Sequence, residues 1–147
     1  MKSAVFRLAS VLRIRRFQMD GAARELALQQ RQLLTAQHLL HSRESKTRRG
    51  RARLQAFVRR GVRAGTLQAV VAGTERLAQE AQVARAELGG ARRKVGAARG
   101  ALLEARTRVG SLEGLQERME RAQRAAHLRL EQRELDEIGQ RRRGELQ

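Results

Sequence analysis

An apolar residue recurs at every seventh position along much of this chain, and few folds accommodate such a repeat. From Val5 the series comprises six apolar residues: Val5, Leu12, Met19, Leu26, Leu33 and Leu40. The offset positions three residues later are mixed, being Leu8, Arg15, Ala22, Gln29, Ala36 and Arg43. A sustained heptad repeat indicates a helix that packs lengthwise against another helix.

A second and cleaner repeat begins at Leu67. Its fourteen places, thirteen of them apolar, are Leu67, Val70, Thr74, Leu77, Ala81, Ala84, Leu88, Ala91, Val95, Ala98, Leu102, Ala105, Val109 and Leu112. Seven glycines in this stretch all lie off the repeat, where each weakens the helix but leaves no hole in the packing. The Gly89-Gly90 pair either bends the helix or is simply tolerated, and both interpretations stay open.

The chain is expected to reverse between the two repeats, at residues 61–66. Gly61 can end one helix in a left-handed conformation and Thr66 can cap the next. The polar residues 42–50 are a rival turn, but a turn there leaves apolar residues of the first helix on a stub. The sequence therefore predicts an all-α fold, a long antiparallel two-helix coiled coil (a helical hairpin), as one unit over residues 1–147.

The predicted hairpin has its first helix at about 3–60 and its second at about 67–140. Residue i then faces roughly residue 127 minus i, so residues beyond about 122 have no partner helix. Composition agrees, because the chain lacks Pro, Cys, Trp and Tyr and has three Phe, too little for a globular core. No apolar run approaches the roughly 20 residues of a membrane span. The basic start, residues 1–19, is similar to a mitochondrial presequence, but the heptad phase continues past it.

The net charge of +17 calls for acidic partners, and nucleic acid, an anionic membrane and an acidic protein all qualify. Residues 43–63 hold nine basic residues against the single acid Glu44. Only Phe57 is available there to stack on bases, and no basic-zipper spacing or zinc finger is present, which disfavours nucleic acid. A solvated basic turn is the favoured interpretation, and peripheral membrane association stays open.

Residues for catalysis or metal binding are missing. His38, His41 and His127 have no cysteine to join them in a zinc site. A two-helix coiled coil has no pocket for a catalytic triad or a small-molecule substrate. We therefore expect no enzyme activity, no catalytic residues, no metal and no cofactor.

One flank of the second repeat carries an arginine in each of four heptads: Arg85, Arg92, Arg99 and Arg106. In an antiparallel pair this flank meets a first-helix flank with Arg16, Ala23, Gln30, Gln37 and Glu44. Only one of the four arginines can then meet an acid. The unmatched charge is either harmless or forms a docking edge for an acidic partner.

Both ends of the chain resemble one family. The first end has Phe6-Arg7-Leu8, Val11-Leu12 and Arg15, followed by residues 22–27, Ala-Ala-Arg-Glu-Leu-Ala. The second end has residues 115–118, Leu-Gln-Glu-Arg, and residues 131–138, Glu-Gln-Arg-Glu-Leu-Asp-Glu-Ile. These motifs resemble the flagellar FliJ proteins of bacterial type III export, which are antiparallel coiled coils of about this size.

The resemblance implies a cytoplasmic stalk in the ring of the flagellar export ATPase, peripheral to the inner membrane, with the export-gate membrane protein and export chaperones as further partners. Gln132, Leu135, Asp136 and Glu137 would contact the ATPase. At the start of the second helix, where the family has bulky apolar residues, Val71 and Leu77 would contribute to the gate contact. This chain has no aromatic residue there. The alternatives are a coiled coil that coats nucleic acid and a structural coiled coil that oligomerises through its seams.

Overall fold

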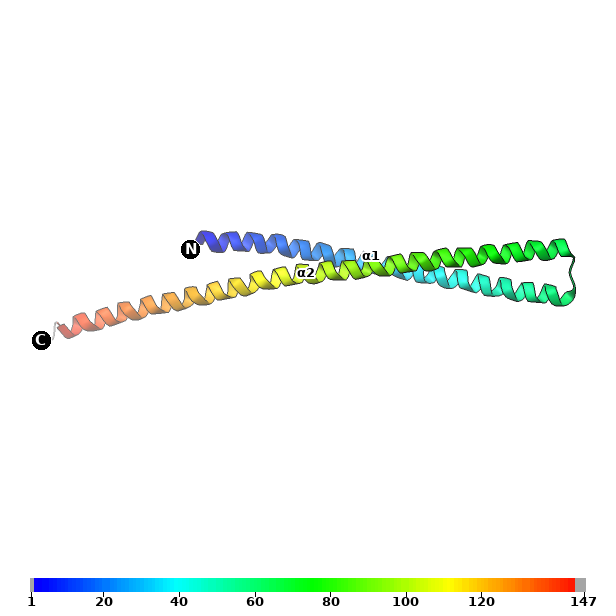
Figure 1. The fold of residues 1–147 in the computed structure, drawn as a ribbon. Helices are drawn as coiled ribbons and strands as arrows, with labels where there is room; N and C mark the ends of the chain where they lie inside the picture. The colour runs from blue at the N-terminus through cyan, green and yellow to red at the C-terminus, as the bar shows by residue number, and fades with distance from the viewer. Residues whose placement is uncertain (1, 145–147) are drawn as a thin grey trace. The chain divides into compact units, whose positions relative to one another are not determined.

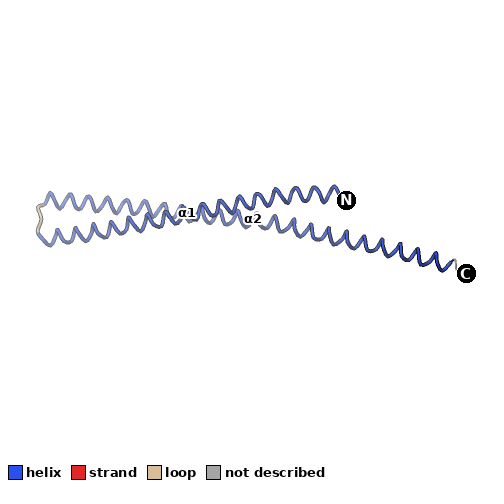
Figure 2. Tube along the Cα trace, turned by 180° about the vertical axis from the view of Figure 1, so that it is seen from behind, coloured by secondary structure: helices blue, strands red, loops and turns tan. Residues whose placement is uncertain are grey.

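Two long helices make up the described chain. The computed structural model describes residues 2–144, and the side chains of residues 7–141. Helix α1 spans Lys2–Arg60 and helix α2 spans Ala64–Gly144 (Figure 1). The three residues 61–63 form the loop between them, drawn in tan in Figure 2. The predicted all-α helical hairpin is confirmed.

The contacts divide the chain into two units. The loop unit consists of Asp20–Leu103, and the terminal unit consists of Met1–Met19 with Glu104–Gln147. Within each unit, a segment of α1 pairs with a segment of α2 that runs the opposite way. Ion pairs join Glu44 to Arg85 in the loop unit and Arg16 to Glu113 in the terminal unit. The position numbers add to 129 in both pairs, close to the expected 127.

The loop is shorter than the expected turn. Gly61 has a positive φ of 70°, a conformation that costs glycine little, and its N–H donates to the Val58 carbonyl at 3.3 Å. The Leu67 N–H donates to the Arg63 carbonyl at 3.0 Å, which begins the second helix. Because α2 already starts at Ala64, Thr66 lies inside its first turn and does not cap it.

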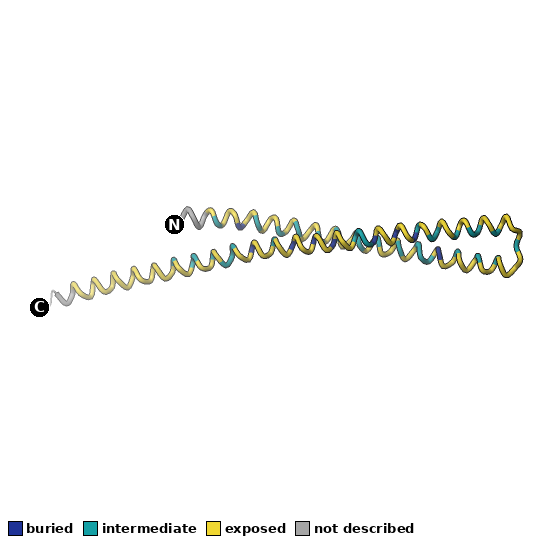
Figure 3. Tube along the Cα trace, in the orientation of Figure 1, coloured by how far each residue is buried: buried dark blue, intermediate teal, exposed yellow. Residues whose placement is uncertain are grey.

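The apolar seam follows the two predicted repeats. On α2, all fourteen expected positions are buried or half-buried, and seven are buried: Ala81, Ala84, Leu88, Val95, Ala98, Leu102 and Val109. On α1, Leu12 is buried and the other described positions through Arg43 are half-buried. The side chains of Val5 and Phe6 lie outside the described residues. Figure 3 shows this seam as the dark blue and teal positions within each unit.

Helix α1 continues through the polar residues 42–50 without a turn. Thr47 is buried in the seam, and its hydroxyl lies 3.0 Å from the Arg43 carbonyl and 3.1 Å from the Leu77 carbonyl of α2. At Gly50, an added Cβ would come within 3.1 Å of the Leu77 Cδ1 atom. The hydrogen-bonded hydroxyl of Thr47 and the absence of a side chain at Gly50 thus let the helices pack closely where the heptad pattern looked broken.

Charged residues on the flanks also join the helices. Arg85 donates to the Glu44 carboxylate at 2.7 Å, and Arg43 pairs with Glu80 on the other flank. The hydrogen bond from Arg85 lowers the pKa of Glu44 below its ordinary 4.5, and the charges of Arg85, Arg48 and His41 act in the same direction. Both side chains keep contact with solvent, at 59% exposure for Arg85 and 39% for Glu44, so the pair contributes little stability and salt will weaken it further.

The seam assignment predicts opposite effects for two neighbouring substitutions. Leu102→Asp places a carboxylate in the buried seam and should cost more than about 3 kcal/mol of unfolding free energy. Gly100→Ala should add roughly 0.5 to 1 kcal/mol, because a Cβ there meets no atom within 4 Å and removes the backbone entropy of glycine. Thermal melts followed by circular dichroism measure both. A neutral or stabilising Leu102→Asp would contradict the seam.

The Glu44–Arg85 pair predicts a pH effect with a definite sign. Because the pKa of Glu44 is lowered in the folded chain, its small stabilising contribution is present above about pH 4.5 and is lost as pH falls through the folded pKa. Arg85→Gln should raise the pKa of Glu44 toward 4.5, as read from its side-chain carboxyl ¹³C shift. Arg48→Gln is the control and should raise this pKa less. An equal response to both variants would refute a specific pair.

Candidate functional site

The end of α2 is exposed on all sides. In the terminal unit, Gln116, Met119 and Gln123 are still half-buried, whereas every residue from 124 to 141 is exposed. The antiparallel register accounts for most of this exposure, because it places Lys2, where α1 begins, opposite about residue 127 of α2. We call residues 124–141 the overhang. Four predicted partner-binding residues lie in it: Gln132, Leu135, Asp136 and Glu137.

The overhang carries an apolar stripe that no described residue covers. Leu128, Leu135 and Ile138 follow one another at spacings of seven and three residues, so they share a helix face. Each of them is more than half exposed. Beside this stripe, Gly139 leaves a hollow in the helix surface bordered by Leu135, Asp136 and Gln140. Leu128 and Ile138 were not among the predicted partner-binding residues, although the seven-residue spacing from Leu128 to Leu135 was a usable signal.

The overhang also carries unpaired acids. Glu131 lies 3.4 Å from His127, a pair that is charged only when the histidine is protonated. Glu134, Asp136 and Glu137 form no ion pair with any residue that the structure describes. Because Arg129 and Arg133 lie among these acids, the overhang presents both signs of charge beside apolar side chains, which complements a partner surface with apolar groups and charged groups of both signs.

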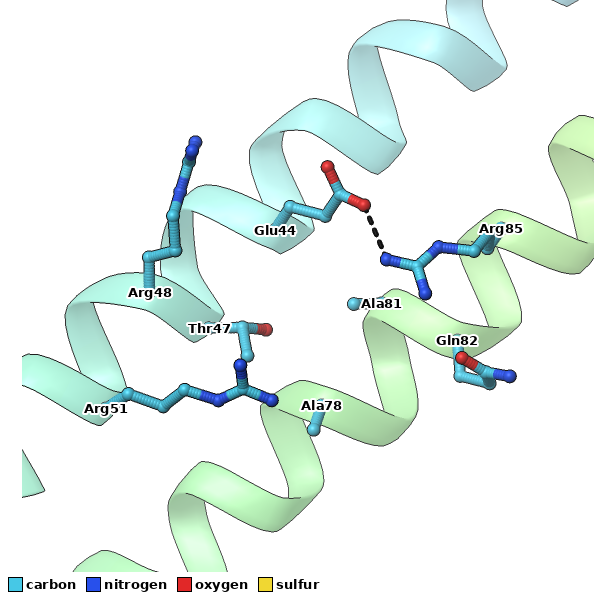
Figure 4. Close-up of a pocket in the computed structure, with 8 residues that line it drawn as sticks. All are labelled: Glu44, Thr47, Arg48, Arg51, Ala78, Ala81, Gln82 and Arg85. Atoms are coloured by element: carbon cyan, nitrogen blue, oxygen red, sulfur yellow. Dashed lines mark hydrogen bonds and ion pairs between the residues drawn. The ribbon is translucent and has the colours of Figure 1, made fainter.

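The four flank arginines differ in their environments. Arg85 is held by Glu44 at 2.7 Å, as the dashed line in Figure 4 marks. Arg92 and Arg99 in the loop unit and Arg106 in the terminal unit are exposed, and none of them has an ion pair within the described part of the chain. The flank therefore offers uncompensated positive charge.

A groove of the loop unit lies at this flank (Figure 4). Its lining comprises Glu44, Thr47, Arg48, Arg51, Ala78, Ala81, Gln82 and Arg85. The small side chains of Ala78 and Ala81 leave room between the helices, and Arg51 of α1 reaches toward Ala78 of α2 in Figure 4. Sequence reasoning missed Arg48 and Arg51 as neighbours of Arg85, because they belong to the other helix.

The two residues expected at the gate contact, Val71 and Leu77, are both half-buried. Leu77 faces α1, since its carbonyl accepts from Thr47 and its side chain lies 3.1 Å from the place a Cβ at Gly50 would occupy. Much of its apolar surface is therefore already used between the helices.

Neither a metal-binding cluster nor a membrane-spanning helix occurs within the described residues. No group of three or more His, Cys, Asp or Glu side chains gathers there in a way that could hold a metal ion. His38 and His41 are both exposed on α1. Neither described helix has a stretch long and apolar enough to cross a membrane.

Comparison with known proteins identifies the family. No curated protein and no solved structure matches the chain. The family model described as flagellar FliJ protein matches residues 3–145, which is nearly the whole chain of 147 residues. The match includes both helices, the loop between them and the overhang. The chain therefore belongs to the flagellar FliJ family and is a component of the flagellar protein export apparatus.

Proposed function

We propose that this protein is an accessory subunit without catalytic activity that binds the ring of the flagellar export ATPase as a central stalk. The overhang makes this contact, with Gln132, Leu135, Asp136 and Glu137 at the interface. The observation that carries the proposal is the exposure of the entire overhang together with its apolar stripe. Exposed apolar side chains rimmed by charges are typical of a surface that another protein covers.

The fold itself does not require the side chains of the overhang. Seam positions are constrained by packing against the other helix, but a helix without a neighbour has no such constraint. A fully solvated helix end would be expected to be polar all round. Four large apolar side chains stand exposed here instead, namely Leu128, Leu130, Leu135 and Ile138. Their burial in a partner accounts for them.

Further contacts are available for the export-gate membrane protein or for export chaperones. In the loop unit they comprise Arg85, Arg92 and Arg99 with Val71 and Leu77 at the start of α2, and in the terminal unit they comprise Arg106. Unpaired guanidinium groups favour acidic partners through steering and through charge-assisted hydrogen bonds. These partners would keep the protein on the cytoplasmic side, peripheral to the inner membrane.

Truncation after Leu130 separates the proposed function from stability. The shortened chain should melt within a few degrees of the full-length chain, because the removed residues that the structure describes bury nothing against α1. The same truncation should weaken stimulation of the ATPase, measured as phosphate release at matched protein concentration. A shortened chain that stimulates fully would refute the ATPase contact.

Two leucines of equal exposure provide a matched pair of point variants. Leu135 in the overhang and Leu103 outside it are both 67% exposed. Leu135→Ala should reduce ATPase stimulation by at least severalfold, as for an apolar anchor at an interface, whereas Leu103→Ala should leave it unchanged. Neither should shift the melting temperature by more than a few degrees. Light scattering could instead show that Leu135→Ala dissociates a homo-oligomer. The apolar stripe would then join copies of this chain, and the alternative function, a structural coiled coil that oligomerises, would hold.

A further inference from the structure

The end of the loop unit that carries the loop is the most basic part of the molecule. Between residues 46 and 76 there are nine basic residues and one acid, Glu75, which give a net charge of +8 out of the total of +17. We call the nine residues the basic collar: Lys46, Arg48, Arg49, Arg51, Arg53, Arg59, Arg60, Arg63 and Arg76. All nine are exposed.

The basic collar has no ion pairs within the described part of the chain. None of its residues forms an ion pair with another residue that the structure describes, and the nearest acid on α1, Glu44, is held by Arg85. Arg59 and Arg60 occupy the last turn of α1, where cations stabilise the helix C-terminus. The other seven have no such role, and several lie three or four residues apart, where like charges repel.

The charges of the collar are arranged around the helix and not on one face of it. Lys46 and Arg53 lie seven residues apart on one flank of α1, Arg51 lies on the opposite flank, and Arg49 lies on the outer side. Arg63 stands in the loop itself. Whichever side of this end approaches a negatively charged plane, several cations therefore meet it.

We propose that the basic collar binds anionic lipid headgroups and places the loop end of the protein against a membrane surface. Clusters of four to eight Lys and Arg residues bind membranes of anionic lipid in this way. Val58, which is 59% exposed between these arginines, adds an apolar contact at the headgroup boundary. This interaction goes beyond the ATPase contact of the overhang and involves none of the same residues.

Nucleic acid is the less favoured polyanion. Proteins that track a duplex gather their cations along one face, and proteins that bind single strands stack bases on aromatic side chains. Phe57 is the one aromatic residue in this region, and it is half-buried in the seam. The collar thus supplies charge on all sides and no stacking platform.

Sedimentation with vesicles tests the proposal on the full-length chain. The protein should bind vesicles containing about one quarter phosphatidylglycerol and should not bind phosphatidylcholine alone, and added salt should release it. The triple substitution Arg49→Gln, Arg53→Gln and Arg63→Gln should weaken binding roughly a hundredfold, at about fivefold per cation. Circular dichroism checks that this variant remains helical.

The control removes the same charge elsewhere in the loop unit. Arg24, Arg31 and Arg93 are exposed and lie outside the collar, so changing these three to Gln should weaken vesicle binding by no more than a few-fold. Equal losses in the two variants would show attraction by net charge alone and would overturn the collar as a site. Failure to bind the anionic vesicles would overturn it as well. The proposal would also be overturned if the protein bound duplex DNA more tightly than anionic vesicles and the triple collar variant lost that DNA binding.

A tryptophan probe locates the contact, since the chain has no tryptophan of its own. Val58→Trp should show a blue shift in emission when anionic vesicles are added. Val83→Trp is the matched control, because Val83 is also 59% exposed but lies outside the collar. A blue shift at Val83 and none at Val58 would overturn the proposal even if vesicle binding is observed. Because no ATPase is present in these assays, their result does not depend on the function proposed for the overhang.

Discussion

The apolar seam between α1 and α2 is the constraint on which the rest of the molecule depends. It is thin, because four of its buried members are alanines or a threonine and no large side chain among the described residues is buried completely. Small side chains bury little apolar area, so each layer stabilises the pair only modestly. The many layers together hold the pair, since the heptad repeat of each helix continues without a change of phase. Continuity also fixes the register, and the register decides which residues of α2 are left without a partner.

The seam is not uniform along its length. Gln29 occupies a seam position, and its side-chain oxygen is buried without a hydrogen-bond partner in the described chain. Arg15 and Arg43 also lie at seam positions and remain half-buried. An unpaired buried polar atom costs stability, so these layers are weaker than those around Leu88, Val95 and Leu102. Binding to partners is therefore expected to contribute to the stability of the helices in the assembled apparatus.

The heptad pattern predicted much of the fold because each seam residue carries the same signal, an apolar side chain at a set spacing. Leu88, Val95 and Leu102 are buried as that spacing requires. Thr47 looked like a break in the repeat because it is polar. Its hydroxyl is satisfied by the carbonyl of Leu77, which belongs to the other helix, and the sequence of α1 alone does not reveal this contact. Arg16 pairs with Glu113 for a similar reason: the pair spans 97 positions and depends on the register. The exposed overhang was predictable, but which of its residues a partner touches was not, because nothing in this chain packs against them.

The distribution of unpaired charge gives the two units different chemistry. In the loop unit, the groups without an ion pair among the described residues include the cations of the basic collar, Arg92 and Arg99. In the overhang of the terminal unit they include the carboxylates of Glu134, Asp136 and Glu137 and also the guanidinium groups of Arg129 and Arg133, beside leucines that no described residue covers. The loop end is therefore strongly basic, whereas the overhang presents both signs of charge beside exposed apolar side chains. This difference favours different partners for the two units, so that neither partner competes with the other for the same residues.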